Sequence, residues 1–296
     1  MMRLNFLLIF LFAFCPTIAL AKLEIPIEVI AGTPYVYLPI NGQRTQFMLD
    51  TGSNIAIHLN KDIAESVVGL RFNGRNVRSI DLAGNVSETE EFIIPNLQID
   101  RMLFRDLKGV IRKPWGLQLG GGSGSPNQNS SVLGIGFFES KKFILDLPNR
   151  SLTIFEADED WSDRSSKWIS IPFHHISEGI AVNLKGHSAN YQMILDSAAT
   201  VSMVKSSSVK PSAKLTKCSF DLGPDRNCQT LEMVVQDKQR LHPILMDMPT
   251  EFGADGILGA DFFALLAVAI DMPNRRIFLL PNKLLPPRSN VKIGVN

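Results

Sequence analysis

The sequence predicts an all-β protein whose chain contains one unit twice. Apolar and polar residues alternate through much of each copy, which is the period of a β-strand, and helical periods are scarce. Ordered matches between the copies share Asp, Gly, Pro and Asn, so we expect a duplicated β unit, and a pseudo-twofold axis can relate its two copies. The matching segments are residues 46–51 with 192–197, 132–138 with 257–263, and 146–150 with 271–275.

Each half contains the same predicted hairpins. Asn-Gly between two apolar runs is a strong hairpin signal, and Pro-Asn marks a second turn. The first half predicts a strand at 23–29, strands at 35–40 and 46–49 around Asn41-Gly42, a short helix within 60–68, and a hairpin of strands 143–147 and 152–155. The second half repeats the two hairpins within residues 180–195 and 267–280.

Residues 1–21 are typical of a secretory signal peptide. A basic Arg3 precedes an apolar run over residues 6–14, and residues 19–21 have the small-residue pattern of a cleavage site. The alternative is a membrane anchor, but the run has about half of the ~20 residues that a spanning helix needs. We therefore expect an exported protein, periplasmic or secreted, without stable membrane insertion.

The rest of the chain divides at an acidic, polar stretch in its middle. Such a stretch is expected to be a solvated linker. The expected parts are a signal peptide at 1–21, an N-terminal β lobe at 22–155, an interlobe linker at 156–168, a C-terminal β lobe at 169–285 and a tail at 286–296.

Charge and cysteine usage exclude several classes of protein. The formal net charge is +1 without a basic block, which argues against a nucleic-acid platform. Cys218 and Cys228 remain after cleavage of the signal, and in an exported protein we expect them to form a disulfide across a short hairpin. A metal site is the alternative, but the histidines show no ligand spacing, so we expect no metal and no cofactor.

An aspartate follows an apolar strand directly in each half, at Asp50 and Asp196. A buried carboxylate is unfavourable unless it is hydrogen-bonded or shares a proton. A pseudo-twofold axis can bring the two carboxyl groups together, and one of them then keeps a proton. Such a pair can take a proton from water and give one to a carbonyl, which is amide hydrolysis without a covalent intermediate.

These motifs resemble those of the aspartic protease family, which includes pepsins and retroviral proteases. Asp-Thr-Gly-Ser stands at residues 50–53, a degenerate copy, Asp-Ser-Ala-Ala, at 196–199, and apolar-apolar-Gly motifs at 132–134 and 257–259. The resemblance covers nearly all of the chain after residue 21. It implies an all-β, bilobal pepsin-like fold, in which two β lobes related by a pseudo-twofold axis enclose a central cleft, and a peptide or protein substrate. We expect a monomer.

The resemblance implies a role for each residue of the two loops. Asp50 and Asp196 would share the proton and bind the lytic water. Thr51 and Ser197 would form the hydrogen bonds that cross between the loops. Ser53 would donate to the outer oxygen of Asp50 and stabilise its charged form, so we expect Asp50 to be the more acidic partner.

The second loop departs from the family pattern at two positions. Ala198 stands where the first loop has Gly52, and its methyl group could narrow the cleft or abolish activity. Ala199 lacks the hydroxyl group of Ser53. Two functions therefore stay open: an exported aspartic endopeptidase, and a catalytically inactive homologue that binds a peptide or a partner protein in the same cleft.

A hairpin from the first half is expected to cover the cleft as a flap. The candidate lies within residues 81–88, with Leu82, Ala83, Gly84 and Asn85 at its tip. Only turn chemistry marks this segment, so an ordinary surface hairpin is the alternative.

Overall fold

The structure is a computed structural model that describes residues 22–82, 84–113, 130–161, 168–186, 188–218, 228–236 and 239–281. The predicted signal peptide, Ala83 of the candidate flap and the predicted tail lie outside the described residues, as do residues 162–167 of the predicted linker. Within the described ranges, no helix has the length and apolar character needed to cross a membrane.

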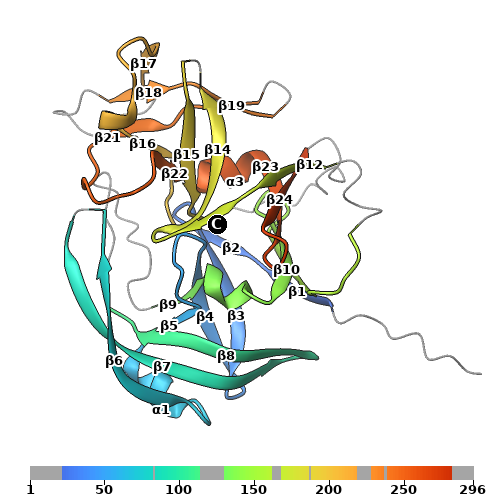
Figure 1. The fold of residues 1–296 in the computed structure, drawn as a ribbon. Coiled ribbons are helices and arrows are strands. Elements are labelled where there is room, and N and C mark those ends of the chain that lie inside the picture. Colours follow the sequence, from blue (N-terminus) through green and yellow to red (C-terminus); the bar gives the residue numbers. More distant parts are fainter. Residues whose placement is uncertain are drawn as a thin grey trace, which may run out of the picture.

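The first lobe is an eight-stranded sheet in the order β2-β3-β4-β9-β5-β8-β7-β6, drawn in blue to green in Figure 1. A short helix lies within the predicted 60–68. The elements of this lobe are β2 (Glu28–Ile30), β3 (Thr33–Ile40), β4 (Gln43–Asp50), β5 (Ile57–Leu59), α1 (Lys61–Ser66), β6 (Arg71–Ile80), β7 (Val86–Ile99), β8 (Met102–Ile111), β9 (Ser131–Gly134) and the 3₁₀ helix η1 (Ile135–Phe138).

The second lobe is a ten-stranded sheet in the order β17-β18-β21-β16-β22-β15-β14-β19-β20, with β13 paired to β14. Its elements are β13 (His174–Ile176), β14 (Gly179–Gly186), β15 (Asn190–Leu195), β16 (Met203–Lys205), η2 (Ser206–Ser208), β17 (Leu215–Lys217), β18 (Gln229–Leu231), β19 (Met233–Gln236), β20 (Gln239–Leu241), β21 (Ile244–Met246), β22 (Gly256–Leu258) and α3 (Ala260–Leu265).

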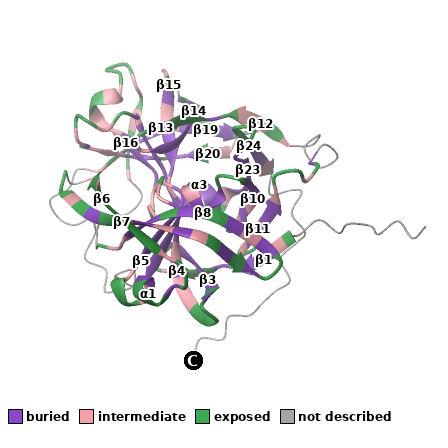
Figure 2. Ribbon diagram, turned by 60° about the horizontal axis from the view of Figure 1, so that its bottom comes forward, coloured by how far each residue is buried: buried purple, intermediate pink, exposed green. Residues whose placement is uncertain are grey.

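A third, six-stranded sheet joins the two halves of the chain. It has the order β1-β11-β10-β23-β24-β12, so each half contributes three neighbouring strands. All six residues of β23 are buried, and Figure 2 shows this sheet packed beside α3. The strands are β1 (Lys22–Pro26), β10 (Lys141–Asp146), β11 (Ser151–Glu156), β12 (Ile169–Pro172), β23 (Leu266–Asp271) and β24 (Arg276–Pro281).

The two lobes repeat one topology around the aspartates. β4, which ends at Asp50, is parallel to β9, and β9 is antiparallel to β5. In the same way β15, which precedes Asp196, is parallel to β22, and β22 is antiparallel to β16. Duplication of the sequence is thus a duplication of the sheet, as predicted. The lobe boundaries at 22–155 and 169–285 stay a prediction.

The repeated Asp-x-Pro-Asn-Arg segment is a structural turn. Asn149 donates its backbone N–H and its side-chain amide to the two carboxylate oxygens of Asp146, at 3.0 and 2.9 Å. Asn274 and Asp271 make the same pair of bonds, at 3.1 and 2.9 Å. This explains why the motif recurs without any catalytic role.

Two parts of the first half differ from the prediction. The strand expected at 23–29 is two strands in different sheets, because Pro26 has no N–H with which to continue the ladder. The long strands β6, β7 and β8 were not predicted. β6 is an edge strand that is exposed along almost all of its length, so its sequence lacks the apolar alternation of a half-buried strand.

Candidate active site

Asp50 and Asp196 meet between the two lobes. Asp50 is the last residue of β4, and Asp196 follows β15 directly. Their carboxyl groups hydrogen-bond to each other, which requires that one of them be protonated. Asp50 is only 5% exposed. The contact predicted from the duplication is therefore present, and Ala198 has not separated the two carboxyl groups.

Four hydrogen bonds cross between the two loops. The hydroxyl group of Ser197 accepts the N–H of Thr51 at 3.1 Å and donates to the carbonyl of Leu49 at 2.7 Å. The hydroxyl group of Thr51 accepts the N–H of Ser197 at 2.9 Å and donates to the carbonyl of Leu195 at 2.9 Å. Both side chains are fully buried. These bonds fix the distance between the two strand ends that carry the aspartates.

The glycine of each apolar-apolar-Gly motif lies directly against a loop. A Cβ atom on Gly134 would stand 2.0 Å from the carbonyl oxygen of Ile55, and one on Gly259 would stand 2.6 Å from that of Val201. Real Cβ atoms do not approach backbone so closely. Only glycine therefore lets the loop after each aspartate pack on the neighbouring strand.

The two carboxyl groups have different hydrogen-bond donors. Asp196 accepts the N–H groups of Ala198 and Ala199, both at 3.0 Å. Asp50 accepts the N–H of Gly52 at 2.9 Å and also that of Ser53. Burial, followed by the negative charge of Asp196, raises the pKa of Asp50 well above the usual value. Burial also raises the pKa of Asp196, and its two N–H donors oppose that rise.

The hydroxyl group of Ser53 does not take its expected place. It forms a 2.9 Å hydrogen bond with Nε2 of His58, and no bond from it to Asp50 is found among the described residues. Ser53 supports the carboxylate of Asp50 through its backbone N–H, as Gly52 does, and not through its side chain. The hydrogen bond on which the expected acidity of Asp50 was based is therefore not found among the described residues, and which aspartate is the more acidic stays a prediction.

His58 is the residue of this site that sequence reasoning missed. It lies in β5 between Ile57 and Leu59, and it is 8% exposed. Burial, followed by the positive charge of Arg112, lowers the pKa of His58 to about 3, so the ring is neutral at ordinary pH. The available signal was a lone histidine inside an apolar strand, just after the Asp-Thr-Gly-Ser loop.

The loops are not equivalent at Gly52 and Ala198. A Cβ atom on Gly52 would stand 2.7 Å from Cγ of Asp196, so the first loop tolerates no side chain there. Ala198 stands at the corresponding position of the second loop and carries a methyl group. The structure accommodates it while the carboxyl groups stay hydrogen-bonded.

The candidate flap is the turn between β6 and β7. Asp81 closes the turn by accepting the N–H of Gly84 on its backbone carbonyl and the N–H of Asn85 on its carboxylate, at 2.9 and 2.8 Å. Leu82 packs against a second-lobe cluster that contains Met248. Figure 1 shows the free end of this hairpin reaching towards the second lobe. Its role as a flap stays a proposal.

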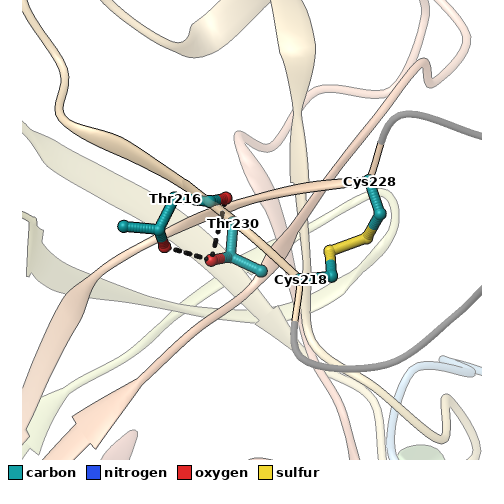
Figure 3. Close-up of a disulfide and its surroundings, with 4 residues drawn as sticks. All are labelled: Thr216, Cys218, Cys228 and Thr230. Atoms are coloured by element: carbon teal, nitrogen blue, oxygen red, sulfur yellow. Dashed lines mark hydrogen bonds between the residues drawn. A yellow bond between two sulfur atoms is a disulfide. The ribbon is translucent and has the colours of Figure 1, made fainter.

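The predicted disulfide between Cys218 and Cys228 is confirmed, with 5.4 Å between the Cα atoms. It extends the β17–β18 ladder, in which the hydroxyl groups of Thr216 and Thr230 hydrogen-bond at 2.8 Å (Figure 3). The pairing decides against cysteine ligation of a metal. No cluster of three or more metal-binding side chains occurs among the described residues.

Residues 36–137 match a family model described as aspartyl protease. The match includes Asp50, the β6–β7 hairpin and the first apolar-apolar-Gly motif. This part of the chain is similar to aspartyl proteases. The similarity supports, at a coarse level, a hydrolase of the aspartic protease type. Comparison with curated proteins gives no match.

Three solved structures share the fold across most of the chain. An aspartic proteinase from Irpex lacteus is 13% identical with a TM-score of 0.55, and the alignment covers 88% of this chain and 97% of that one. Soybean basic 7S globulin is 10% identical, with a TM-score of 0.56 and coverage of 88% and 95%. Lupine conglutin gamma, also a basic 7S globulin, is 10% identical with a TM-score of 0.56, and the alignment covers 89% of this chain and 95% of that one. At these identities the likeness shows the fold alone, and the predicted bilobal pepsin-like fold is confirmed.

Proposed function

We propose that the protein is an exported aspartic endopeptidase that hydrolyses peptide bonds with a water held between Asp50 and Asp196. The observation that carries this proposal is the hydrogen-bonded pair of carboxyl groups at the junction of the lobes, with the pKa of both raised. A carboxyl pair that shares one proton contains an acid and a base at working pH.

The electrostatics of the pair favour one assignment of the two roles. Burial and the negative charge of Asp196 raise the pKa of Asp50, so Asp50 carries the proton, while Asp196 carries the charge and acts as the base. Asp196 takes a proton from the water as its oxygen bonds to the carbonyl carbon, and Asp50 protonates the carbonyl oxygen. The tetrahedral intermediate then collapses: Asp196 gives its proton to the leaving nitrogen, Asp50 regains one from the hydroxyl group, and the C–N bond breaks.

An extended peptide is the substrate that suits the site. Peptides bound as strands between β elements use their backbone for affinity and alternate side chains for specificity. The β6–β7 hairpin, whose Leu82 reaches the second lobe, is proposed to cover the bound chain. Export is supported by the Cys218–Cys228 disulfide, since such bonds persist in oxidising compartments.

One observation favours a second function, a catalytically inactive homologue that binds a peptide or partner protein. Ala198 carries a methyl group at the position of the second loop that corresponds to Gly52, where a Cβ atom would stand 2.7 Å from Cγ of Asp196. A methyl group at this position reduces the room for a substrate carbonyl. The two globulins named above share this fold at similar TM-scores, so the fold does not decide between the two functions.

Hydrolysis of a mixed peptide library between pH 3 and 7 tests the proposal. Cleavage by the parent that is lost in Asp50→Asn supports the endopeptidase. Cleavage that survives this substitution contradicts the role of the carboxyl pair.

Ala198→Gly separates the two functions. If the parent does not cleave and this variant does, the inactive homologue is the better description. If the parent cleaves, the variant measures how much Ala198 slows the reaction.

A further inference from the structure

His58 and Ser53 form a polar pair beside only one of the two aspartates. In the first lobe His58 pairs with Val132 across β5 and β9, and its Nε2 hydrogen-bonds to the hydroxyl group of Ser53. Sheet pairing identifies the equivalent positions in the second lobe: Ile257 corresponds to Val132, and its partner across the sheet is Met203. The second lobe therefore has Met203 in place of His58.

The second lobe replaces both members of the pair by apolar residues. Ala199 corresponds to Ser53, and it packs against the cluster that contains Met203. Ser53 lies three residues after Asp50, and the backbone N–H of Ser53 already contacts the carboxyl group of Asp50. The direction of the Ser53 hydroxyl group therefore decides whether Asp50 gains another donor.

We propose that His58 is a positioning residue that holds the hydroxyl group of Ser53 away from Asp50, so that the carboxyl pair keeps its shared proton to higher pH. This inference rests on the proposed function of the pair as acid and base. Without the bond to His58, the hydroxyl group of Ser53 would donate to the carboxylate of Asp50 and stabilise its charged form. His58 thereby extends the working range of the pair towards neutral pH.

The surroundings of His58 suit this task. β5 lies between β8 and β9, which place Val110 and Val132 opposite His58. The charge that acts on it is that of Arg112, which follows β8, and Tyr35 of β3 acts on Arg112 in turn. Because Arg112 is positive, it favours the neutral ring. In the proposal this ring is protonated at Nδ1, so that Nε2 accepts the hydroxyl proton of Ser53 without adding charge beside the pair. The charge that acts on Asp50 is that of Asp196.

Titration of the carboxyl groups tests the proposal without any need for activity. Aspartate Cγ resonances are followed by ¹³C NMR from pH 2 to 9 in the full chain, and Asp50→Asn and Asp196→Asn assign the pair. In His58→Met, which copies the second lobe, the apparent pKa values of the pair should fall by about one unit, the size expected of one hydrogen bond to a charged group. In His58→Gln, which keeps a polar side chain that can bond to Ser53, they should stay near those of the parent.

Two further variants keep the test decisive if His58→Met does not fold. Ser53→Ala should leave the titration of the pair unchanged. If the hydroxyl group of Ser53 already donated to Asp50 in the parent, this substitution would instead raise the pKa of Asp50. Ala199→Ser is the matched control, since Met203 cannot hold the new hydroxyl group and the pKa of Asp196 should fall.

The proposal is overturned if the apparent pKa values of the pair do not change in His58→Met. It is also overturned if His58→Met lowers them equally when Ser53 has been replaced by Ala. If the parent cleaves peptides, the limbs of its pH–rate profile should move with the titration. If it cleaves none, the titration still decides the role of His58, while the proposed protease function fails separately.

Discussion

At the scale of single residues, the environments of Asp50 and Asp196 differ through the side chains beside them. Each carboxyl group accepts two backbone N–H groups, but only the first loop has a hydroxyl group at Ser53, and it is hydrogen-bonded to His58. Both carboxyl groups are held where their pKa is raised, so the folded protein binds protons more tightly than the unfolded chain does. The proton at the site is therefore linked to the stability of the fold.

The linkage gives a pH-dependent prediction for Asp50→Asn. When the pKa of a carboxyl group is raised on folding, the free energy of unfolding falls as the pH rises from the usual aspartate pKa through the raised one. The variant should therefore gain thermal stability over the parent as the pH rises from 4 to 7. The gain is about 1.4 kcal/mol, or about 2–4 °C, for each unit of the raised pKa.

Differential scanning calorimetry at several pH values measures this gain. The exposed Asp158→Asn is the control and should show no such trend. A difference in Tm that is constant or shrinks with pH would refute the linkage.

At the scale of elements, the two hairpins at the periphery have different supports. The β6–β7 turn is closed by Asp81 and contacts the second lobe through Leu82. The β17–β18 hairpin is held by a covalent bond beside its Thr–Thr pair. The first can open at the expense of an apolar contact, whereas the second cannot open while the protein is oxidised.

Leu82→Ala tests the contact between the hairpin and the second lobe. Loss of about 1–2 kcal/mol of apolar burial should make the amides of Gly84 and Asn85 exchange about tenfold faster. Hydrogen exchange followed by NMR gives the rates. Val86→Ala, at a residue that is 53% exposed, should change them little. Equal rates in the parent and Leu82→Ala would show that the contact does not hold the hairpin.

The double substitution Cys218→Ala and Cys228→Ala tests the disulfide. The bond joins residues with a sequence separation of 10, and a loop of that size contributes about 2–3 kcal/mol in the chain-entropy model. Urea unfolding without reductant should show a loss of that size. Replacing Thr216 and Thr230 by valine should cost under about 1 kcal/mol, since both partners are removed together. An unchanged urea midpoint in the cysteine variant would contradict the prediction.

At the scale of the whole molecule, the six-stranded sheet fastens the two halves together. β10 and β23 are its central pair, and Lys142 of β10 lies directly opposite Asp271 of β23. Nζ of Lys142 lies 3.5 Å from that carboxylate and donates to the carbonyl of Glu159 at 2.7 Å. The side chains of Lys142 and Asp271 are 10% and 8% exposed, so water screens their interaction little.

Lys142→Ala should destabilise the protein by about 3 kcal/mol, because it leaves a buried carboxylate without its cation. Guanidinium unfolding measures the loss. Lys22→Ala, in an exposed pair with Glu24, should cost under about 1 kcal/mol. Equal losses would mean that the buried pair is no stronger than a surface pair.

The parts of the fold that the sequence predicted are those set by local chemistry. Asn41-Gly42 specifies a hairpin by itself, and the paired aspartates and glycines reveal the duplication. The direction of the hydroxyl group of Ser53 could not be predicted, since its partner His58 reaches it only when β5 enters the sheet. β6 was not predicted because an edge strand that is exposed on both faces lacks the alternation of apolar and polar residues.

A single covalent chain allows the two loops to differ, which an assembly of two identical chains does not. In a symmetric homodimer any substitution appears twice, once beside each carboxyl group. Gly52 shows that one loop has no room for even a methyl group, whereas Ala198 carries one in the other. Joining the halves in one gene thus frees each loop to mutate alone. One aspartate can then be adapted to hold the proton while its counterpart is adapted to release it.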